Sequence, residues 1–338
     1  MNGRLSRLFA YALFRMAIPR RPWRLPELPG AEQFTARSVD GVALAGWLVR
    51  NARRRGTVLI IHGLTRDCTS DGIPAWGERF TARGFAVAAI DLRGHGRSQP
   101  AVPGFGSIEA ADVRAGIDAC VAAGLPQPFT VIGGSLGALA GQCAAIEDAR
   151  IAALVLLAMP ASPTHGLMVG AQAVVALARP ELRAHVGVAL ASVICLGLSA
   201  FARGAGAIGR LLDRAHGFPA LRSADVLRRR IPAQRPLVLS IIGAADPYDW
   251  RATARAWRRW ASADAKPFKR PAEAPHQAAW FVLAPGLGHP PMSPHLLEWA
   301  GLGPLLDQFL ELVAVRHQRQ APEAEAGNSR LMLDHPAN

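Results

Sequence analysis

A serine between two glycines is the best candidate nucleophile in this chain. Residues 129–137 read F-T-V-I-G-G-S-L-G, so an apolar segment enters a G-x-S-x-G turn at Ser135, and helix-forming residues 136–145 follow at once. Such a turn holds a serine hydroxyl exposed on a strained backbone, while Gly133 and Gly137 let strand and helix approach closely. The helix amino end presents free N–H groups to a developing oxyanion. This context favours a nucleophile over a structural serine in a tight turn.

A His-Gly pair ends a second apolar segment, T-V-L-I-I-H-G-L-T at residues 57–65. We predict that His62 shapes the loop rather than acting as a base, because it stands directly before Gly63 at a strand end. The loop then supplies one oxyanion donor, the N–H of Leu64, and the serine turn supplies the other, the N–H of Leu136.

The segment I-D-L-R-G-H-G-R-S at residues 90–98 holds a second carboxylate and histidine. Asp91 and His95 are flanked by glycines, which favours a turn pinned by local hydrogen bonds over catalysis.

Two further strand ends offer an acid and a base. Residues 236–246 read P-L-V-L-S-I-I-G-A-A-D and end at Asp246, with Asp249 as the fallback acid. Residues 279–289 end in a glycine-rich loop that presents His289, whereas His276 and His295 follow no such loop. A histidine can take the serine proton and pass it to the leaving group, and a carboxylate can orient that histidine. Serine, acid and histidine therefore follow one another at strand ends.

Strand-like and helix-like segments alternate around these residues. The strand-like runs are Val42–Val49, Thr57–His62, Phe85–Asp91, Phe129–Gly134, Ala152–Met159, Pro236–Gly243 and Ala279–Pro285. The helical candidates are Ile73–Arg83, Ser107–Ala123, Leu136–Ile146, Trp250–Ala261 and Ser293–Val315. Several strands are continuously apolar, which is typical of a parallel sheet buried on both faces. The alternation predicts an α/β fold with helices on both sides, where chemistry occurs at the carboxyl ends of the strands.

These motifs together resemble the α/β-hydrolase superfamily, and within it the group of S33 aminopeptidases, monoacylglycerol lipases and lysophospholipases. The resemblance covers roughly residues 35–315 and includes the whole triad in its expected order. It implies an eight-strand, mostly parallel sheet, no metal or organic cofactor, and hydrolysis through an acyl-enzyme. The sequence departs from the pattern in one place, since His289 follows Asp246 by 43 positions, and Lys266–His276 looks like an insertion.

Residues 160–231 occupy the place where such relatives carry a lid. Two apolar stretches, Leu167–Ala178 and Val186–Ala202, precede a basic region, Arg203–Arg230. The second stretch holds 17 uncharged residues, just short of a membrane span, and one span would place Ser135 and Asp246 on opposite sides of a bilayer. We therefore expect a helical cap that lines an apolar acyl pocket or packs on the core, with an outer face able to touch lipid.

Composition limits the partners. The 338 residues are half hydrophobic and carry a net charge of +13, and only Lys266 and Lys269 of the 38 basic residues are lysine. The arginines are scattered and no nucleic-acid-binding motif accompanies them, so we expect no nucleic-acid partner and leave an anionic lipid surface open. Four widely spaced cysteines without a CxxC pair exclude a disulfide scaffold or zinc ribbon.

The expected organisation has four parts. Residues 1–30 form a basic amphipathic segment and a Pro-rich linker, residues 31–159 and 232–318 the hydrolase core, residues 160–231 the cap, and residues 319–338 a disordered tail. Met1–Ile18 is interpreted either as an interfacial membrane helix or as a helix or loose arm belonging to the domain. We expect a cytoplasmic protein with peripheral membrane contact through this segment or the cap.

The sequence thus predicts a serine hydrolase that cleaves carboxylic esters with a hydrophobic acyl group through Ser135, His289 and Asp246. Amide hydrolysis and acyl transfer by the same triad are alternatives. A non-catalytic binding protein on the same fold is the alternative from another class.

Overall fold

The computed structural model describes most of the core and part of the cap. The described residues are 24–70, 72–101, 104, 106–160, 179–180, 182–200, 204, 235–246, 279–284, 287–288 and 301–320. The predicted helix Trp250–Ala261, the first apolar stretch Leu167–Ala178 and the amino-terminal segment Met1–Ile18 lie outside them.

An eight-stranded sheet forms the centre of the molecule, in the order β1-β2-β4-β3-β5-β6-β7-β8. The strands are β1 (Ala31–Arg37), β2 (Ala43–Val49), β3 (Thr57–Ile61), β4 (Ala86–Ile90), β5 (Phe129–Gly134), β6 (Ile151–Leu157), β7 (Leu237–Gly243) and β8 (Ala279–Ala284). Strand β2 pairs antiparallel with both β1 and β4, and the pairs from β4 to β8 are parallel. The carboxyl ends of the parallel strands therefore share one edge.

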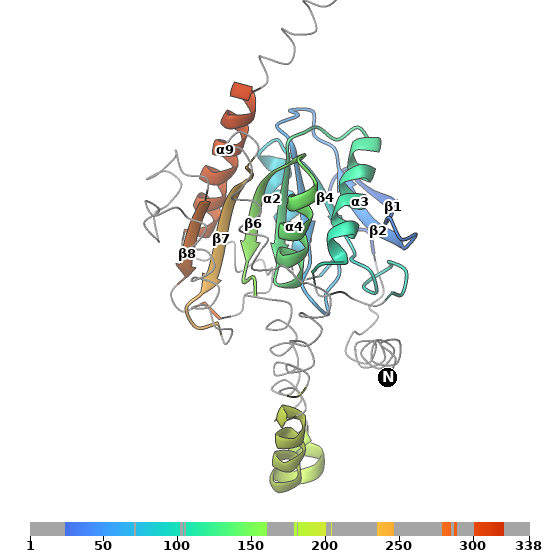
Figure 1. Cartoon of the computed structure of the whole chain (residues 1–338), viewed down its shortest axis with the longest axis vertical. Coiled ribbons are helices and arrows are strands. Elements are labelled where there is room, and N and C mark those ends of the chain that lie inside the picture. The colour runs from blue at the N-terminus through green and yellow to red at the C-terminus, as the bar shows by residue number, and fades with distance from the viewer. Residues whose placement is uncertain are drawn as a thin grey trace, which may run out of the picture.

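Helices cover both faces of the sheet (Figure 1). Helices α3 (Glu109–Ala122) and α4 (Leu136–Glu147) pack on one face, and α2 (Ile73–Ala82) and α9 (Leu302–Gln320) on the other. The second face buries large aromatic side chains, among them Trp47, Trp76 and Phe309. Burial of this apolar surface on both faces of the sheet provides the main driving force for the fold.

Seven of the eight strands coincide with the strand-like runs of the sequence, and the exception is β1. Each of its side chains is exposed or half-buried, and it includes Glu32 and Arg37. An edge strand of this kind has no continuous apolar run, so the pattern that revealed the buried strands does not detect it. Helix α9 continues past the predicted end at Val315 to Gln320, two residues into the expected tail.

The described part of the segment predicted to form a cap is strongly apolar. Within the described residues, one helix, Leu182–Ala200, is long and apolar enough to cross a membrane by length and composition. It lies beyond the carboxyl ends of the parallel strands, at the lower end of Figure 1. Gly187 within it has a φ of +75°, so the regular helical path breaks there.

Candidate active site

Ser135 occupies a strained turn between β5 and α4. Its backbone has φ 50° and ψ −107°, in the left-handed range that costs a non-glycine residue about 1–3 kcal/mol. Two contacts hold the turn in place: the Ser135 N–H donates to Leu157 O at 2.8 Å, and Ser135 O accepts from the Ala138 N–H at 3.1 Å. The predicted strand–turn–helix context of the serine is present in the structure.

The two flanking glycines allow this turn to pack. A methyl group on Gly133 would collide with the backbone of Gly137, and one on Gly137 would lie 2.6 Å from His62 O. Neither position has room for a side chain. The turn therefore lies directly against the end of β3, where the loop with the proposed second oxyanion donor begins.

The loop after β3 borders the serine. A methyl group on Gly63 would lie 3.4 Å from Gly134 O and 3.7 Å from Ser135 Cβ. In the described part of the chain, neither the Leu64 N–H nor the Leu136 N–H has a hydrogen-bond acceptor. Two unused amides on either side of a serine are what an oxyanion site requires.

The candidate acid belongs to a loop that is tied to the end of β8. Asp246 is buried, and its N–H donates to Gly243 O at 3.2 Å. The Ala245 N–H donates to Leu287 O at 3.0 Å, and a methyl group on Gly243 would overlap that same carbonyl. The acid loop therefore lies against a residue two positions before His289, which is itself outside the described residues, as are Asp249, His276 and His295.

Main-chain hydrogen bonds link the strand ends between serine and acid. Beyond the Ser135–Leu157 bond, the Ala158 N–H donates to Ile241 O at 2.8 Å, so the ends of β5, β6 and β7 are joined in sequence. With strands about 4.8 Å apart, the serine turn and the acid loop are separated by about 10 Å.

Comparisons with known proteins agree with this geometry. Residues 52–193 match the family model described as serine aminopeptidase, S33. The chain has the α/β-hydrolase fold, and over residues 52–193, which include the Ser135 turn, it is similar to serine hydrolases of this family. A search of curated proteins finds no match to the hydrolase.

Solved structures show the same fold. The Pyrococcus furiosus esterase Pf2001 is 17% identical, with a TM-score of 0.57 over 89% of this hydrolase and 98% of the esterase. DcsB, solved with a substrate analogue, is 16% identical, with a TM-score of 0.53 over 85% and 99% of the two chains. A cold-adapted esterase from an Arctic intertidal metagenomic library is 17% identical, with a TM-score of 0.50 over 85% and 99%.

His62 fixes the loop after β3, which carries the predicted oxyanion donor Leu64. Its buried Nε2 accepts the Leu92 N–H at 3.0 Å, so Nδ1 carries the ring hydrogen and donates to Gly63 O at 2.7 Å. In a trans peptide the Gly63 carbonyl and the Leu64 N–H point in opposite directions, so fixing the oxygen also fixes the donor. With both ring nitrogens engaged, His62 acts as a structural residue, as its position before Gly63 predicts.

Removing this ring should weaken catalysis more than binding. In His62→Ala the Gly63 carbonyl loses its anchor and the Leu64 N–H is no longer held toward Ser135. We expect kcat to fall about 100-fold with KM nearly unchanged, because the oxyanion forms only in the transition state. Steady-state kinetics on a soluble ester measures both. His62→Asn, which can still donate and accept, should recover part of kcat, and wild-type kcat in His62→Ala would contradict the role.

The loop after β4 is joined to the loop after β3 by a hydrogen bond. Buried Asp91 accepts the Cys68 N–H at 2.7 Å and the Arg97 N–H at 2.8 Å, and His95 Nδ1 lies 2.9 Å from Arg93 O. Burial raises the pKa of Asp91. The contacts with Arg97 and Arg93 are local, as the sequence interpretation predicts, whereas the Asp91–Cys68 bond joins this loop to the loop after β3.

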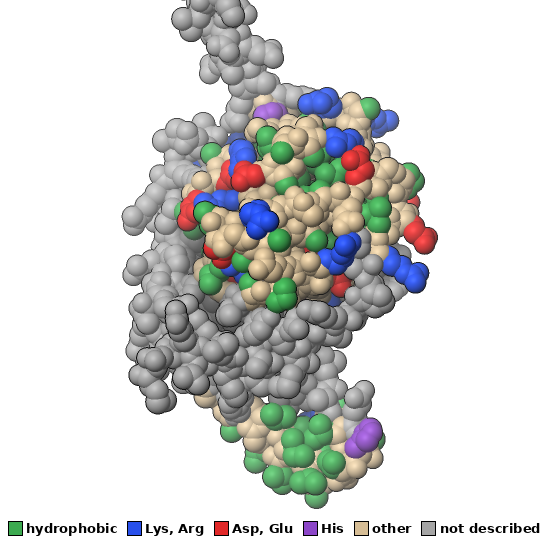
Figure 2. All heavy atoms as spheres, turned by 90° about the vertical axis from the view of Figure 1, so that its right-hand side faces the viewer, with side chains coloured by type: hydrophobic (Ala, Val, Ile, Leu, Met, Phe, Trp, Pro, Cys, Tyr) green, Lys and Arg blue, Asp and Glu red, His purple; other side chains and the backbone are tan. Residues whose placement is uncertain are grey.

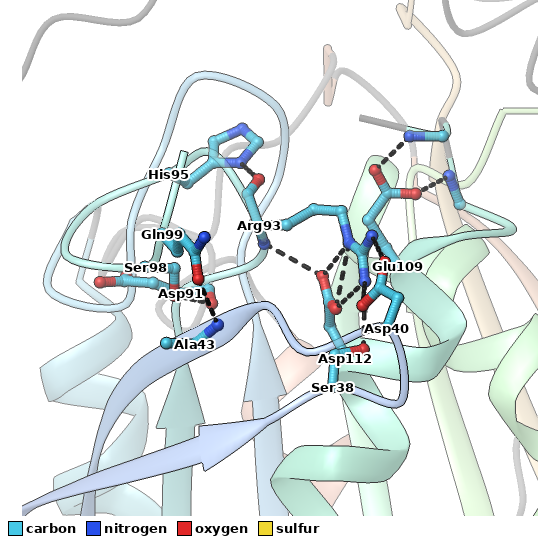
Figure 3. Close-up of polar contacts among 12 residues, drawn as sticks. Ser38, Asp40, Ala43, Asp91, Arg93, His95, Ser98, Gln99, Glu109 and Asp112 are labelled. Carbon is cyan, nitrogen blue, oxygen red and sulfur yellow. Dashed lines mark hydrogen bonds and ion pairs between the residues drawn. The ribbon is translucent and has the colours of Figure 1, made fainter. Parts of the chain in front are cut away.

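A buried ion cluster anchors this loop to two other elements (Figure 3). Arg93 is 3% exposed, and its guanidinium binds Asp112 on α3, Asp40 in the β1–β2 turn and Ser38 Oγ. Burial alone would lower the pKa of Arg93, but the hydrogen bonds that its guanidinium donates to Asp112 and Asp40 outweigh burial and raise the pKa. Sequence reasoning missed this cluster, because its members are far apart in the chain and each resembles an ordinary surface charge.

Glu109 performs a similar task at the start of α3. Its two carboxylate oxygens accept the N–H groups of Gly104 and Gly106, each at 2.7 Å, and burial raises its pKa. A methyl group on Gly106 would lie 2.7 Å from Leu139 Cβ, so the loop that Glu109 holds packs on α4. Helix α4, which follows the serine turn, is thus braced by a buried carboxylate.

Acid should destabilise the hydrolase through His95. Burial lowers the pKa of His95 to about 3, and the nearby His62 adds to the effect. In the unfolded chain His95 binds a proton below about pH 6.5, whereas in the folded chain it stays neutral down to about pH 3. The free energy of unfolding therefore decreases as the pH falls from 6.5 toward 3. At pH 5 the loss is about 2 kcal/mol.

Thermal unfolding of wild type and His95→Gln across this range tests the effect. Glutamine cannot titrate, so the variant should show a flatter dependence of Tm on pH between about 7 and 5. Parallel curves for the two proteins would contradict the assignment.

Within the described residues no group of three His, Cys, Asp or Glu side chains could hold a metal ion.

Proposed function

We propose that this hydrolase cleaves carboxylic esters with a hydrophobic acyl group, using Ser135 as nucleophile, His289 as base and Asp246 as the orienting acid. The observation that carries the proposal is the strained Ser135 backbone with the unpaired N–H groups of Leu64 and Leu136 beside it. Two proteins of the same fold are described as esterases, one from Pyrococcus furiosus and one from an Arctic metagenomic library.

The proposed mechanism follows from these assigned roles. His289 takes the proton of the Ser135 hydroxyl as Oγ attacks the ester carbonyl carbon, and the N–H groups of Leu64 and Leu136 bind the oxyanion. Asp246 stabilises the imidazolium, which then protonates the departing alcohol and leaves an acyl-enzyme. A water molecule, deprotonated by His289, attacks the acyl carbon and releases the carboxylic acid and the free serine.

An apolar acyl group fits the cap. The described helix Leu182–Ala200 carries no charged residue from Val186 onward and lies on the side of the sheet where the parallel strands end (Figure 1). Apolar cap residues favour a hydrophobic substrate group over a charged one.

Amide hydrolysis is the second candidate, because the matching family model is that of a serine aminopeptidase. An aminopeptidase needs a carboxylate to hold the substrate amino terminus. In the described part of the chain the buried carboxylates are already engaged by protein groups, and they are Asp67, Asp91, Glu109, Asp112, Asp148 and Asp246. Ester hydrolysis is therefore favoured, and acyl transfer would differ only in the acceptor that attacks the acyl-enzyme.

A substrate panel tests this choice. We expect p-nitrophenyl esters to be hydrolysed with kcat/KM rising from acetyl to octanoyl, because the longer chain buries more apolar surface. Leucine p-nitroanilide should be turned over poorly or not at all. A preference for the anilide, or for acetyl over octanoyl, would contradict the proposed substrate class.

The same proposal extends to location. The four cysteines are all free thiols, as is usual in a reducing compartment, which supports a cytoplasmic site. Met1–Ile18, with arginines among apolar residues, is proposed to contact the membrane surface.

A further inference from the structure

The cap carries an exposed apolar surface with no cover in the described structure. It consists of six side chains of the helix Leu182–Ala200, each between 40% and 67% exposed: Val186, Val188, Leu190, Val193, Leu196 and Leu198. Figure 2 shows apolar side chains gathered at this end of the molecule. Monomeric soluble proteins rarely expose a patch of this kind unless it meets a partner or a membrane. We call these six side chains the cap surface.

The cap surface points to almost every side of its helix. From Val188 onward, at about 100° per residue, the exposed residues Val188, Leu190, Val193, Leu196 and Leu198 spread around the whole circumference. Only Ala191 and Cys195, one turn apart, are buried in this stretch. A folded protein partner covers one side of a helix and would leave the other apolar residues in water. A lipid phase surrounds the helix and covers all of them.

The charges around the cap surface indicate which lipid. The sequence contains no Asp or Glu between Glu181 and Asp213, whereas it contains Arg183, His185, Arg203 and Arg210 in that interval. Arg183 and His185 are exposed at the start of the helix. Cations beside an inserted apolar surface bind anionic headgroups, and the net charge of +13 attracts the whole chain to a negative surface.

From the exposure on all sides and the one-signed charge, we propose that the cap surface inserts into one leaflet of an anionic lipid bilayer. Lipid surrounds the helix within that leaflet, and the helix does not span the bilayer. The φ of +75° at Gly187 distorts the helix, and β6 and β7, the strands before and after this segment, are paired neighbours and so lie on the same side of any bilayer. Because the cap lies beyond the carboxyl ends of the strands (Figure 1), docking brings Ser135 toward the membrane. If the proposed esterase function holds, membrane-dissolved esters reach the site directly.

Vesicle binding of the full-length chain tests this inference. Wild type is sedimented with phosphatidylcholine vesicles, with and without phosphatidylserine, and compared with the variant Leu190→Ser/Val193→Ser/Leu196→Ser. The matched control is Val39→Ser/Val121→Ser. It removes two exposed apolar side chains from the surface of the α/β domain and leaves the cap surface unchanged. We expect wild type and control to bind the anionic vesicles, and the cap variant to bind at least about tenfold more weakly. Hydrolysis of a soluble acetyl ester reports whether each variant is folded, so failure of the esterase proposal shows in wild type and is separate from loss of binding.

Two single variants distinguish a lipid from a protein partner. They also replace the triple variant if that variant does not fold. Leu196→Lys should retain binding to anionic vesicles better than Leu196→Glu, since only the lysine suits the headgroups. The inference is wrong if wild type does not bind anionic vesicles, or if the cap variants bind as wild type does. It is also wrong if wild type is a dimer in gel filtration that both Leu196 variants convert to a monomer without a change in vesicle binding, since the cap surface then meets a second copy.

Discussion

Ser135→Ala is expected to reduce kcat for ester hydrolysis on the order of 10⁴-fold or more, the scale seen when a triad nucleophile is lost. The alanine removes the attacking oxygen and nothing else, because the turn is fixed by the main-chain bonds of residue 135 to Leu157 and Ala138. Binding of a non-hydrolysed substrate analogue should stay close to wild type. Activity above a hundredth of wild type in Ser135→Ala would show that another residue is the nucleophile.

Ser135→Gly separates the role of the side chain from that of the backbone. Glycine adopts a φ of 50° without strain, so this variant should unfold at a higher temperature than Ser135→Ala while being equally inactive. The expected difference in the free energy of unfolding is about 1 kcal/mol. Equal stability of the two variants would mean that the turn stores no strain.

Asp246→Asn is expected to lower kcat about 10⁴-fold while leaving the fold intact. Asparagine keeps the shape of the side chain, but it cannot stabilise an imidazolium and it favours the wrong histidine tautomer. The main-chain bonds that attach this loop to the end of β8, from Ala244 to Ala284 and from Ala245 to Leu287, do not involve the carboxylate. An unchanged melting temperature of Asp246→Asn, measured together with the kinetics, would show that the lower kcat is not due to unfolding.

The matched control for Asp246 is Asp249→Asn. Asp249 lies three residues further along the same segment and is the fallback acid from the sequence. We expect it to retain activity within about threefold of wild type. If Asp249→Asn is inactive and Asp246→Asn is active, the acid assignment is wrong.

The buried strands and the serine turn could be predicted because their signals are local. A continuous apolar run such as Thr57–Ile61 reads as a strand buried on both faces, and G-x-S-x-G between strand and helix permits few backbone geometries. The structural role of His62 was also accessible, since a histidine directly before a glycine at a strand end has little freedom to reach the serine.

What the sequence did not predict depends on contacts between distant segments. Arg93 forms ion pairs with Asp40, 53 positions earlier in the chain, and with Asp112, 19 positions later. Glu109 accepts hydrogen bonds from a loop that packs on α4. No local pattern distinguishes these charges from surface charges. Strand β1 was not predicted for a different reason. It lies at the edge of the sheet, so it lacks the continuous apolar run that identifies the other strands.

The number of apolar residues in the predicted cap does not decide whether this segment spans a membrane or only contacts one. The stretch Val186–Ala202 is nearly long enough for a membrane span, yet the break at Gly187 and the pairing of β6 with β7 favour interfacial contact. The role of His289 is inferred from the order of the motifs and from the attachment of Leu287 to the acid loop.

Labelling with a fluorophosphonate probe tests the central claim most directly, namely that Ser135 is an activated nucleophile. The probe reacts covalently only with a serine whose hydroxyl is deprotonated by a neighbouring base beside an oxyanion site. We predict that wild type is labelled, that peptide mapping places the adduct on Ser135, and that Ser135→Ala is not labelled. A folded wild-type protein that remains unlabelled, or an adduct on another residue, would contradict the account.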